Sequence, residues 1–216
     1  LPSCLARFTL LRVAVRAGEP HDVRRQDKHQ PRASHVVLIA KYDPTWPSSF
    51  EAEAERIRHT FGSQALRIEH VGSTSVPGLA AKPVIDIQIS VASLEPRELY
   101  HTWLHNLGYT HFSLGTFDLV YPFFTRPVGW PSTHHVHLCA DASVQERDHL
   151  AFRDYLRSYP TAAAEYAALK RKLARSHDGL TMESQEQYSL SKTEFVTSVL
   201  VRAATESPGH PSRVDA

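Results

Sequence analysis

The 216-residue sequence lacks the features that mark secreted and membrane proteins. Its only two cysteines, Cys4 and Cys139, exclude a disulfide framework and indicate a reducing compartment, so we expect a cytoplasmic protein. No apolar run approaches the roughly 18 residues of a membrane-spanning helix, which argues against a membrane partner. The formal net charge is only +1, so the composition also argues against a nucleic-acid partner.

What remains is the composition of an ordinary globular protein, with 42% apolar and 22% charged residues. Residues 1–33 end in a polar, basic run without apolar periodicity and are predicted to be a disordered leader. Residues 34–203 are predicted to form a single domain. Residues 204–216 are rich in Pro, Ser and Gly, which predicts a disordered tail.

Hydrophobic periodicity predicts a mixed β-sheet flanked by helices, with a helical C-terminal part. Strands are expected near residues 66–71, 84–91, 117–124 and 135–139, and residues 36–40 are expected to form a short buried strand or an extended arm. Helices are expected near residues 48–61, 94–107, 143–159, 160–173 and 184–199. Three of these helices begin with capping-box spacing: Ser48 with Glu51, Ser143 with Glu146, and Ser184 with Gln187. The fold class is therefore α/β or α+β, and the apolar helix faces leave a homo-oligomer open.

The segment from residue 68 to residue 87 carries the strongest chemical signal, because a strand runs into a turn-rich loop and a second strand begins with Asp86. Four consecutive residues could donate to phosphate oxygens through N–H groups or hydroxyls: Gly72, Ser73, Thr74 and Ser75. Asp86 could hold a Mg²⁺ ion bound to the same phosphates. The simpler alternative is a long turn in which backbone amides cap Asp86. The loop lacks the spacing and the terminal Gly-Lys-Ser/Thr of a P-loop.

This loop, with residues 37–46 before it and residues 152–156 and 166–173 after it, resembles the GrpB family over roughly residues 36–202. The run Gly72–Leu79 is quite specific to that family. The resemblance implies a nucleotidyltransferase fold, in which a Gly-Ser turn and a strand bearing Asp-x-Asp bind a metal–nucleotide complex. Some family members are fused to dephospho-coenzyme A kinase.

By that resemblance, residues 72–73 match the Gly-Ser turn and Asp86 matches the first acid, but Gln88 stands at the position of the second. An amide is a poor Mg²⁺ ligand, and nucleotidyl transfer generally needs metal held by two or three carboxylates. Glu69 or Asp118 could supply the missing ligand, or the protein could have no second carboxylate at the site. We predict Asp86 and Glu69 as ligands of Mg²⁺ or Mn²⁺ bound with a nucleoside triphosphate.

A second polar set lies on the strand near residues 135–139, where His135 and His137 share one face. They could line the site as general bases or phosphate ligands, or they could be ordinary hydrogen-bonded histidines. With His70 they could instead form a three-nitrogen zinc site. Lys82 and Lys192 are the cations predicted to contact phosphate.

The leading functional hypothesis is a metal-dependent protein of nucleotidyltransferase fold that binds a nucleotide or another small phosphorylated ligand. If it is active, it transfers a nucleotidyl group to an unknown acceptor, with Asp86, His135 and His137 as the catalytic residues. The alternative is a non-catalytic binding or partner-stabilising module, which Gln88 favours. A third hypothesis is the histidine-ligated zinc hydrolase.

Overall fold

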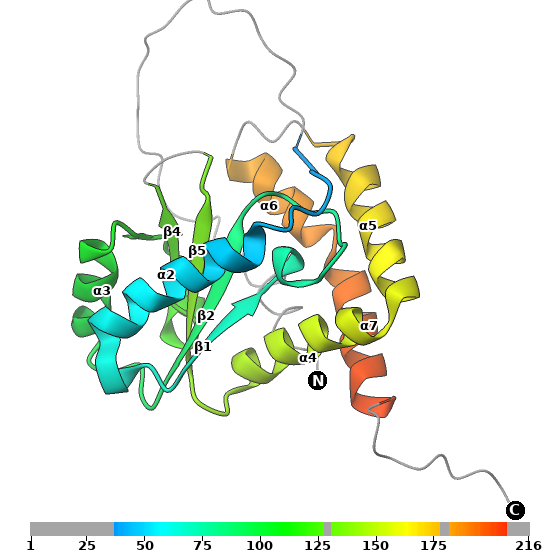
Figure 1. Ribbon diagram of the computed structural model, residues 1–216. Coiled ribbons are helices and arrows are strands. Elements are labelled where there is room, and N and C mark those ends of the chain that lie inside the picture. Colours follow the sequence, from blue (N-terminus) through cyan, green and yellow to red (C-terminus); the bar gives the residue numbers. More distant parts are fainter. Residues whose placement is uncertain (1–36, 128–130, 178–181, 207–216) are drawn as a thin grey trace, which may run out of the picture.

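The computed structural model describes residues 37–127, 131–177 and 182–206 (Figure 1). The predicted leader, residues 1–33, lies outside this part of the chain, as do residues 207–216 of the predicted tail. The helices are α2 (Trp46–Phe61), α3 (Arg97–Asn106), α4 (Val144–Ser158), α5 (Pro160–Ala174), α6 (Met182–Leu190) and α7 (Thr193–Thr205). The strands are β1 (Arg67–Val71), β2 (Ile85–Val91), β3 (Thr110–His111), β4 (Phe123–Arg126) and β5 (His134–Ala140). Short 3₁₀ turns are η2 (Gly62–Gln64), η3 (Ser73–Ser75) and η4 (Gly115–Leu119).

The strands form one mixed sheet in the order β1-β2-β5-β4-β3, which confirms the predicted fold class. Only β2 and β5 run parallel, and the remaining neighbours are antiparallel. In the parallel pair, Asp86 lies opposite His135 and Gln88 lies opposite His137. The register therefore brings the acid of one central strand beside the histidines of the next.

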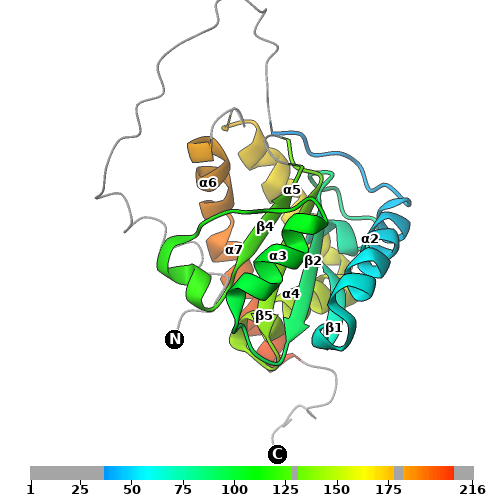
Figure 2. The same cartoon turned by 90° about the vertical axis from the view of Figure 1, so that its left-hand side faces the viewer.

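The two faces of the sheet differ in chemistry because side chains along β2 alternate. Its isoleucines pack under α2 and α3 in the main hydrophobic core, whose buried members include Ile57, Ile87, Ile89 and Leu104. Figures 1 and 2 show these two helices on the same side of the sheet. The polar residues Asp86, Gln88 and Ser90 point to the opposite face, where α4 lies. A central strand thus carries a buried polar stripe, and each of its members needs a hydrogen-bond partner.

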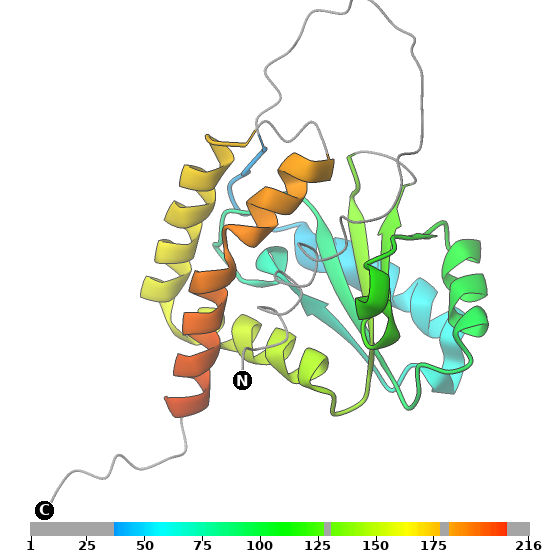
Figure 3. The same cartoon turned by 180° about the vertical axis from the view of Figure 1, so that it is seen from behind.

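The C-terminal helices hold the loop between β1 and β2. Helices α4, α5 and α7 form a second core, which includes Val76 and Leu79 of that loop. Arg157 of α4 donates to the carbonyl oxygen of Ser75 at 2.9 Å. Figure 3 shows α5, α6 and α7 side by side, to the left of the sheet. The helical part predicted from the sequence therefore positions the loop that carries the candidate chemistry. Among the described residues, no helix has the length and apolarity needed to cross a membrane.

The expected strand over residues 117–124 is wrong, because η4 occupies residues 115–119 and β4 begins only at Phe123. The carboxylate of Asp118 accepts from the backbone N–H of Leu114 and from the hydroxyl of Ser113, which closes a turn. Gly115, at φ +66°, allows that turn. Only the end of the apolar run, from Phe123 onward, therefore joins the sheet. Near residues 36–40 the described chain forms only an isolated bridge between Ala40 and Ala81, not a strand.

Two of the three predicted capping boxes are wrong. Ser48 lies inside α2, which begins at Trp46, and its hydroxyl donates to the carbonyl of Thr45. Ser184 lies inside α6, which spans Met182–Leu190, so it does not cap that helix, and α7 begins separately at Thr193. Only Ser143 caps its helix as predicted, accepting from the backbone N–H of Glu146.

Candidate functional site

Asp86, His135 and His137, the three predicted catalytic residues, lie together in the structure. The Oδ1 atom of Asp86 lies 3.1 Å from Nδ1 of His135 and 3.2 Å from Nε2 of His137. The side chain of Asp86 is 24% exposed, so one side of the carboxylate remains open to a ligand. Burial by itself would raise the pKa of Asp86, but the hydrogen bonds of the two rings outweigh it and hold that pKa well below its usual range. Asp86 is therefore a carboxylate near neutral pH.

Gly72 lies against the other oxygen of that carboxylate. Its φ of +68° belongs to the left-handed region, and a Cβ at this position would lie 2.4 Å from Oδ2 of Asp86. Only glycine allows the loop backbone to approach the acid this closely. The next residue, Ser73, is hydrogen-bonded to the hydroxyl of Tyr166 from α5. The Gly-Ser turn and the acid thus form one unit, as the sequence predicted.

The hydroxyls of Thr74 and Ser75 hold the loop itself rather than facing Asp86. The buried hydroxyl of Thr74 donates to the carbonyl of Val84 at 3.0 Å and is also bonded to His70. The hydroxyl of Ser75 donates to the carbonyl of Gly72 at 2.6 Å. Two of the four predicted phosphate donors therefore serve as internal supports of the turn.

The ring of His135 is bonded at both nitrogens, since its Nε2 lies 2.9 Å from the hydroxyl of Ser132. Ser132, His135 and Asp86 have the connectivity of a Ser-His-Asp triad. Ser132 is only 6% exposed, however, so a substrate cannot reach its hydroxyl in this arrangement. We therefore assign Ser132 the role of fixing the His135 ring.

Gln88, at the position of the second acid, belongs to a chain of polar side chains that leads back to Asp86. It is 0% exposed, and its Oε1 lies 2.8 Å from Nδ1 of His149 on α4. The hydroxyl of Tyr121 lies 2.6 Å from Nε2 of His149 and 2.7 Å from Nδ1 of His137. Protein side chains thus fill the place where a second metal-binding acid would point.

Proton accounting fixes the direction of this chain when both rings are neutral. Burial lowers the pKa of His137, and burial followed by repulsion from His137 lowers that of His149 to about 3. If Oε1 of Gln88 faces His149, Nδ1 of His149 donates to it, the Tyr121 hydroxyl donates to Nε2 of His149, and Nδ1 of His137 donates to Tyr121. Nε2 of His137 then carries no hydrogen to donate to Asp86. That orientation also buries Nε2 of Gln88 without a partner among the described residues.

Exchanging the oxygen and nitrogen of the Gln88 amide gives Nε2 an acceptor and restores the hydrogen between His137 and Asp86. Nε2 of Gln88 then donates to Nδ1 of His149, whose Nε2–H donates to Tyr121. The hydroxyl of Tyr121 donates to Nδ1 of His137, and Nε2–H of His137 donates to Asp86. An amide can begin this chain of donors, whereas an ionised carboxylate cannot. Gln88 is therefore a positioning residue for Asp86.

We predict that His137 and His149 both carry their protons on Nε2. Long-range ¹H–¹⁵N NMR spectra distinguish the two neutral tautomers directly. Gln88→Glu should reverse the chain and move the proton of His149 to Nδ1, because a carboxylate only accepts. An Nδ1-protonated His149 in the unsubstituted protein would contradict this assignment.

Of the two proposed additional acids, Glu69 on β1 lies opposite Gln88 and shares the polar face with Asp86, but an arginine engages it, whereas Asp118 lies elsewhere. The carboxylate of Glu69 accepts from Arg153 at 2.6 Å. Asp118 lies in η4, next to the opposite edge of the sheet, 3.6 Å from Nε2 of His111. Among the described residues, no group of three or more His, Cys, Asp or Glu side chains is arranged to hold a metal ion.

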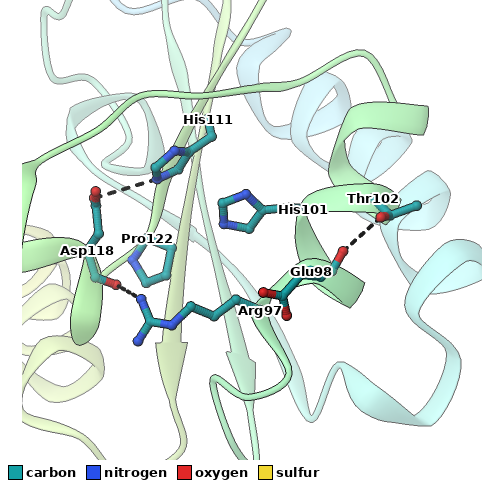
Figure 4. Close-up of a pocket in the computed structure, with 7 residues that line it drawn as sticks. All are labelled: Arg97, Glu98, His101, Thr102, His111, Asp118 and Pro122. Atoms are coloured by element: carbon teal, nitrogen blue, oxygen red, sulfur yellow. Dashed lines mark hydrogen bonds and ion pairs between the residues drawn. The ribbon is translucent and has the colours of Figure 1, made fainter.

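Asp118 instead helps to line a separate cavity of about 490 Å³, formed by Arg97, Glu98, His101, Thr102, His111, Asp118 and Pro122 (Figure 4). Arg97 crosses its floor and donates to the carbonyl oxygen of Asp118 at 2.7 Å. The cavity borders β3 and β4, whereas Asp86 lies on β2, on the other side of β5. The cavity and the Asp86 site are therefore distinct places in the fold.

The three-histidine zinc site is wrong. His70 pairs with Ile87 across β1 and β2, so it shares the apolar face of the sheet. Its ring stacks on Phe50 of α2 with centroids 4.8 Å apart. His135 and His137 point to the opposite face with Asp86, and the sheet separates the two sets of rings.

The two predicted phosphate-contacting lysines come together from distant parts of the chain. Lys82 and Lys192 each place the ammonium nitrogen 4.5 Å from the centroid of the Tyr188 ring. Burial opposes their charge and lowers the pKa of Lys82 to about 7 and that of Lys192 to about 8, while the attraction of Asp86 partly offsets it. Both cations therefore lie within electrostatic reach of the carboxylate.

Sequence reasoning missed the residues that support this site: Tyr121, Ser132, His149, Tyr166 and Lys170. Ser132 occurs in a turn-rich segment, and each of the others occurs in a segment whose local pattern indicates only a helix or an apolar run. One signal was available, because Tyr166 and Lys170 are four residues apart and share a helical face.

Comparison with known proteins shows that residues 36–202 match the model of the GrpB protein family. UPF0157 protein YqkA of Bacillus subtilis is 38% identical over 74% of this chain and 45% of that protein, so the chain spans less than half of that relative. A dephospho-CoA kinase of Mycolicibacterium paratuberculosis is 34% identical over 66% of this chain and 41% of that protein. The crystal structure of the conserved protein GrpB from Enterococcus faecalis superposes with a TM-score of 0.68 at 33% identity. It covers 78% of this chain and 98% of that chain.

Proposed function

Because this chain belongs to the GrpB family, we propose that it binds a small phosphorylated ligand, a nucleotide by preference, between the Gly72–Ser73 turn and Asp86. The observation that most directly supports this proposal is that a Cβ added at Gly72 would lie only 2.4 Å from Oδ2 of Asp86. This approach brings the backbone of the Gly-Ser turn beside an ionised carboxylate, and that carboxylate attracts the ammonium groups of Lys82 and Lys192. Donors, cations and one acid at a single place suit phosphate oxygens and an accompanying cation.

The donor set fits one kind of magnesium site. Mg²⁺ commonly keeps several waters and is held by one or two carboxylates together with substrate phosphates. Asp86 supplies one carboxylate, while Arg153 holds Glu69 and Gln88 closes the position of the second acid. The residues therefore suit an ion that enters with the phosphates, Mg²⁺ or Mn²⁺, rather than a preformed two-metal centre. When bound, that ion would neutralise charge on the phosphates.

His135 and His137 then serve mainly to orient Asp86. Both nitrogens of His135 are engaged, by Asp86 and by Ser132, and both nitrogens of His137 are engaged, by Asp86 and by Tyr121. Neither ring has a free lone pair to take a proton from a substrate in this arrangement. Their contribution is to hold the carboxylate in one position with its second oxygen toward the loop.

Two outcomes for the bound nucleotide follow from this site. Transfer of a nucleotidyl group would break the bond between the α- and β-phosphates, attach the α-phosphate to an acceptor and release pyrophosphate. The second candidate is a binding module without chemistry. It is favoured by Gln88, which the 2.8 Å contact with His149 holds in place of a second acid.

The experiment is equilibrium binding of the four ribonucleoside triphosphates and of dephospho-coenzyme A, with Mg²⁺ or with a chelator, followed by a pyrophosphate-release assay. The kinase relative motivates the coenzyme A precursor. Magnesium-dependent binding supports the proposal, and pyrophosphate release then separates the transferase from the binding module. Absence of binding by every phosphorylated compound would contradict it.

A further inference from the structure

Three lysines converge on two neighbouring tyrosines beside the Asp86 site. Lys82, from the loop before β2, and Lys192, at the start of α7, both face the ring of Tyr188. Lys170, on α5, places its ammonium 4.5 Å from the centroid of the Tyr166 ring. Figures 1 and 3 show α5, α6 and α7 side by side, so segments far apart in sequence build this cluster.

Two polar atoms in this cluster are buried without a hydrogen-bond partner among the described residues: Nζ of Lys170 and the hydroxyl of Tyr188. Lys170 is 2% exposed and Tyr188 is 1% exposed. Proteins rarely bury such groups unpaired, since each loses its bonds to water. The fold does provide partners for a buried cation elsewhere, because Arg153 contacts Glu69 and Asp154. The unpaired Lys170 therefore calls for a partner that the described part of the chain does not supply.

We propose that the lysine cluster, defined as Lys82, Lys170 and Lys192 with Tyr188, binds the outer phosphates of a polyphosphate whose inner phosphate lies at the Gly72–Ser73 turn. This inference rests on the proposed function and names its ligand class, a nucleoside di- or triphosphate. Lys82 and Lys192 are half-buried and approach the ligand from the open side. Lys170 and the Tyr188 hydroxyl gain the anionic acceptor that they lack in the free protein.

The geometry joins the lysine cluster to the turn. Tyr166 lies under Lys170 and is hydrogen-bonded to Ser73, so one side chain borders both places. Asp86 attracts all three ammonium groups. A chain of two or three phosphates would satisfy both the turn and the lysine cluster with one ligand. Once a ligand has restored their protons, three lysines against one carboxylate supply an excess of positive charge that matches a polyanion.

The lowered pKa values of the three lysines in the free protein agree with a site that binds an anion. Burial, then repulsion from Lys192 and Arg171, lowers the pKa of Lys170 to about 6, and the attraction of Asp86 only partly offsets these effects. A bound polyphosphate would raise the pKa of each lysine in the cluster, so binding near pH 8 should take up protons. Calorimetry in two buffers of different ionisation enthalpy measures that uptake.

The test is calorimetric titration of inorganic triphosphate with Mg²⁺ into the full chain carrying Lys170→Met. We expect binding about 10–100-fold weaker, the range for losing a hydrogen bond to a charged group. The melting temperature of the free protein should stay the same or rise, because the substitution removes a buried amine that has no hydrogen-bond partner among the described residues. Lys172→Met, at an exposed position on the same helix, is the matched control and should change neither quantity.

Tyr188→Phe provides a second variant that keeps the shape of the ring. It should weaken triphosphate binding several-fold without lowering the melting temperature, because it removes only the unpaired hydroxyl. Unchanged affinity in both variants would overturn the inference, as would a lower melting temperature with unchanged affinity, the sign of a structural role. If Asp86→Asn abolishes nucleotide binding while both cluster variants bind normally, the proposed function stands and this inference fails. If the unsubstituted protein binds no phosphorylated compound, both fail.

Discussion

Replacing Asp86 with Asn should abolish metal-dependent nucleotide binding, with a loss of about 100-fold or more in affinity. The substitution keeps the shape of the side chain and one acceptor oxygen for the rings of His135 and His137, which lie 3.1 and 3.2 Å away. It removes the one carboxylate that we assign as a metal ligand. Substituting a residue that only hydrogen-bonds to a metal ligand already lowers metal affinity about 10–100-fold, so loss of the ligand itself should cost at least as much. Calorimetric titration of nucleoside triphosphate with Mg²⁺ measures the effect.

The matched control for this variant is Glu98→Gln, which neutralises an acid that lines the separate cavity in Figure 4. It should leave the affinity unchanged. If Glu98→Gln weakens binding and Asp86→Asn does not, the ligand binds at the separate cavity and the assignment of the Asp86 site is wrong. Circular dichroism and a melting curve would show that both variants keep the fold.

Gly72→Ala should disrupt the site through backbone geometry alone. A residue with a Cβ at φ +68° and ψ −171° costs about 1–3 kcal/mol. The Cβ would in addition meet Oδ2 of Asp86 at 2.4 Å, so the carboxylate or the loop must move. We expect a loss of about 2–4 kcal/mol in the free energy of unfolding, within the range for backbone strain combined with a steric clash. Ligand binding should be lost with it.

Gly78→Ala is the control that separates the backbone cost of a positive φ from the clash with Asp86. Gly78 also has a positive φ, +77°, but a Cβ added there would meet no other atom within 4 Å. This variant should therefore show only the backbone cost, about 1–2 kcal/mol, and should bind ligand normally. Equal losses of stability and binding in the two variants, measured by urea unfolding and calorimetry, would show that the close approach to Asp86 has no special role.

The part of the site formed by neighbouring residues could be predicted from the sequence. A strand, a Gly-Ser turn and an acid on the next strand lie within 20 residues, and the alternation along β5 correctly places His135 and His137 on one face. Local patterns contain this information because turn chemistry and the two-residue period of a strand act over short distances.

The supports of the site could not be predicted because they depend on packing between distant segments. Gln88 and His149 are 61 residues apart, and Tyr121 and His137 meet because the apolar run before β4 turns at η4 instead of continuing as a strand. The sequence showed Gln88 only as the absence of an acid. The structure shows a hydrogen-bonded amide whose two kinds of polar atom set the direction of a proton chain.

The burial of the lysines could not be predicted from the sequence either, because it too depends on packing between distant segments. Lys170 falls in the basic run at residues 170–172, and such a run on a helix is usually exposed. Its ammonium is buried because α6 and α7 pack beside α5, with a break between residues 190 and 193 where one continuous helix was predicted. That break places Lys192 next to Tyr188, and no local pattern shows this contact.

Thermal unfolding of the protein with nucleoside triphosphates, in Mg²⁺ and in a chelator, tests the central claim most directly. A ligand present at about 100 times its dissociation constant adds roughly 2.7 kcal/mol to the free energy of unfolding. For a chain of this size, that corresponds to a rise of about 5–10 °C in the melting temperature. The account predicts such a rise in Mg²⁺, a much smaller one in the chelator, and none for Asp86→Asn. An unchanged melting temperature with every nucleotide, or an equal rise in Asp86→Asn, would contradict it.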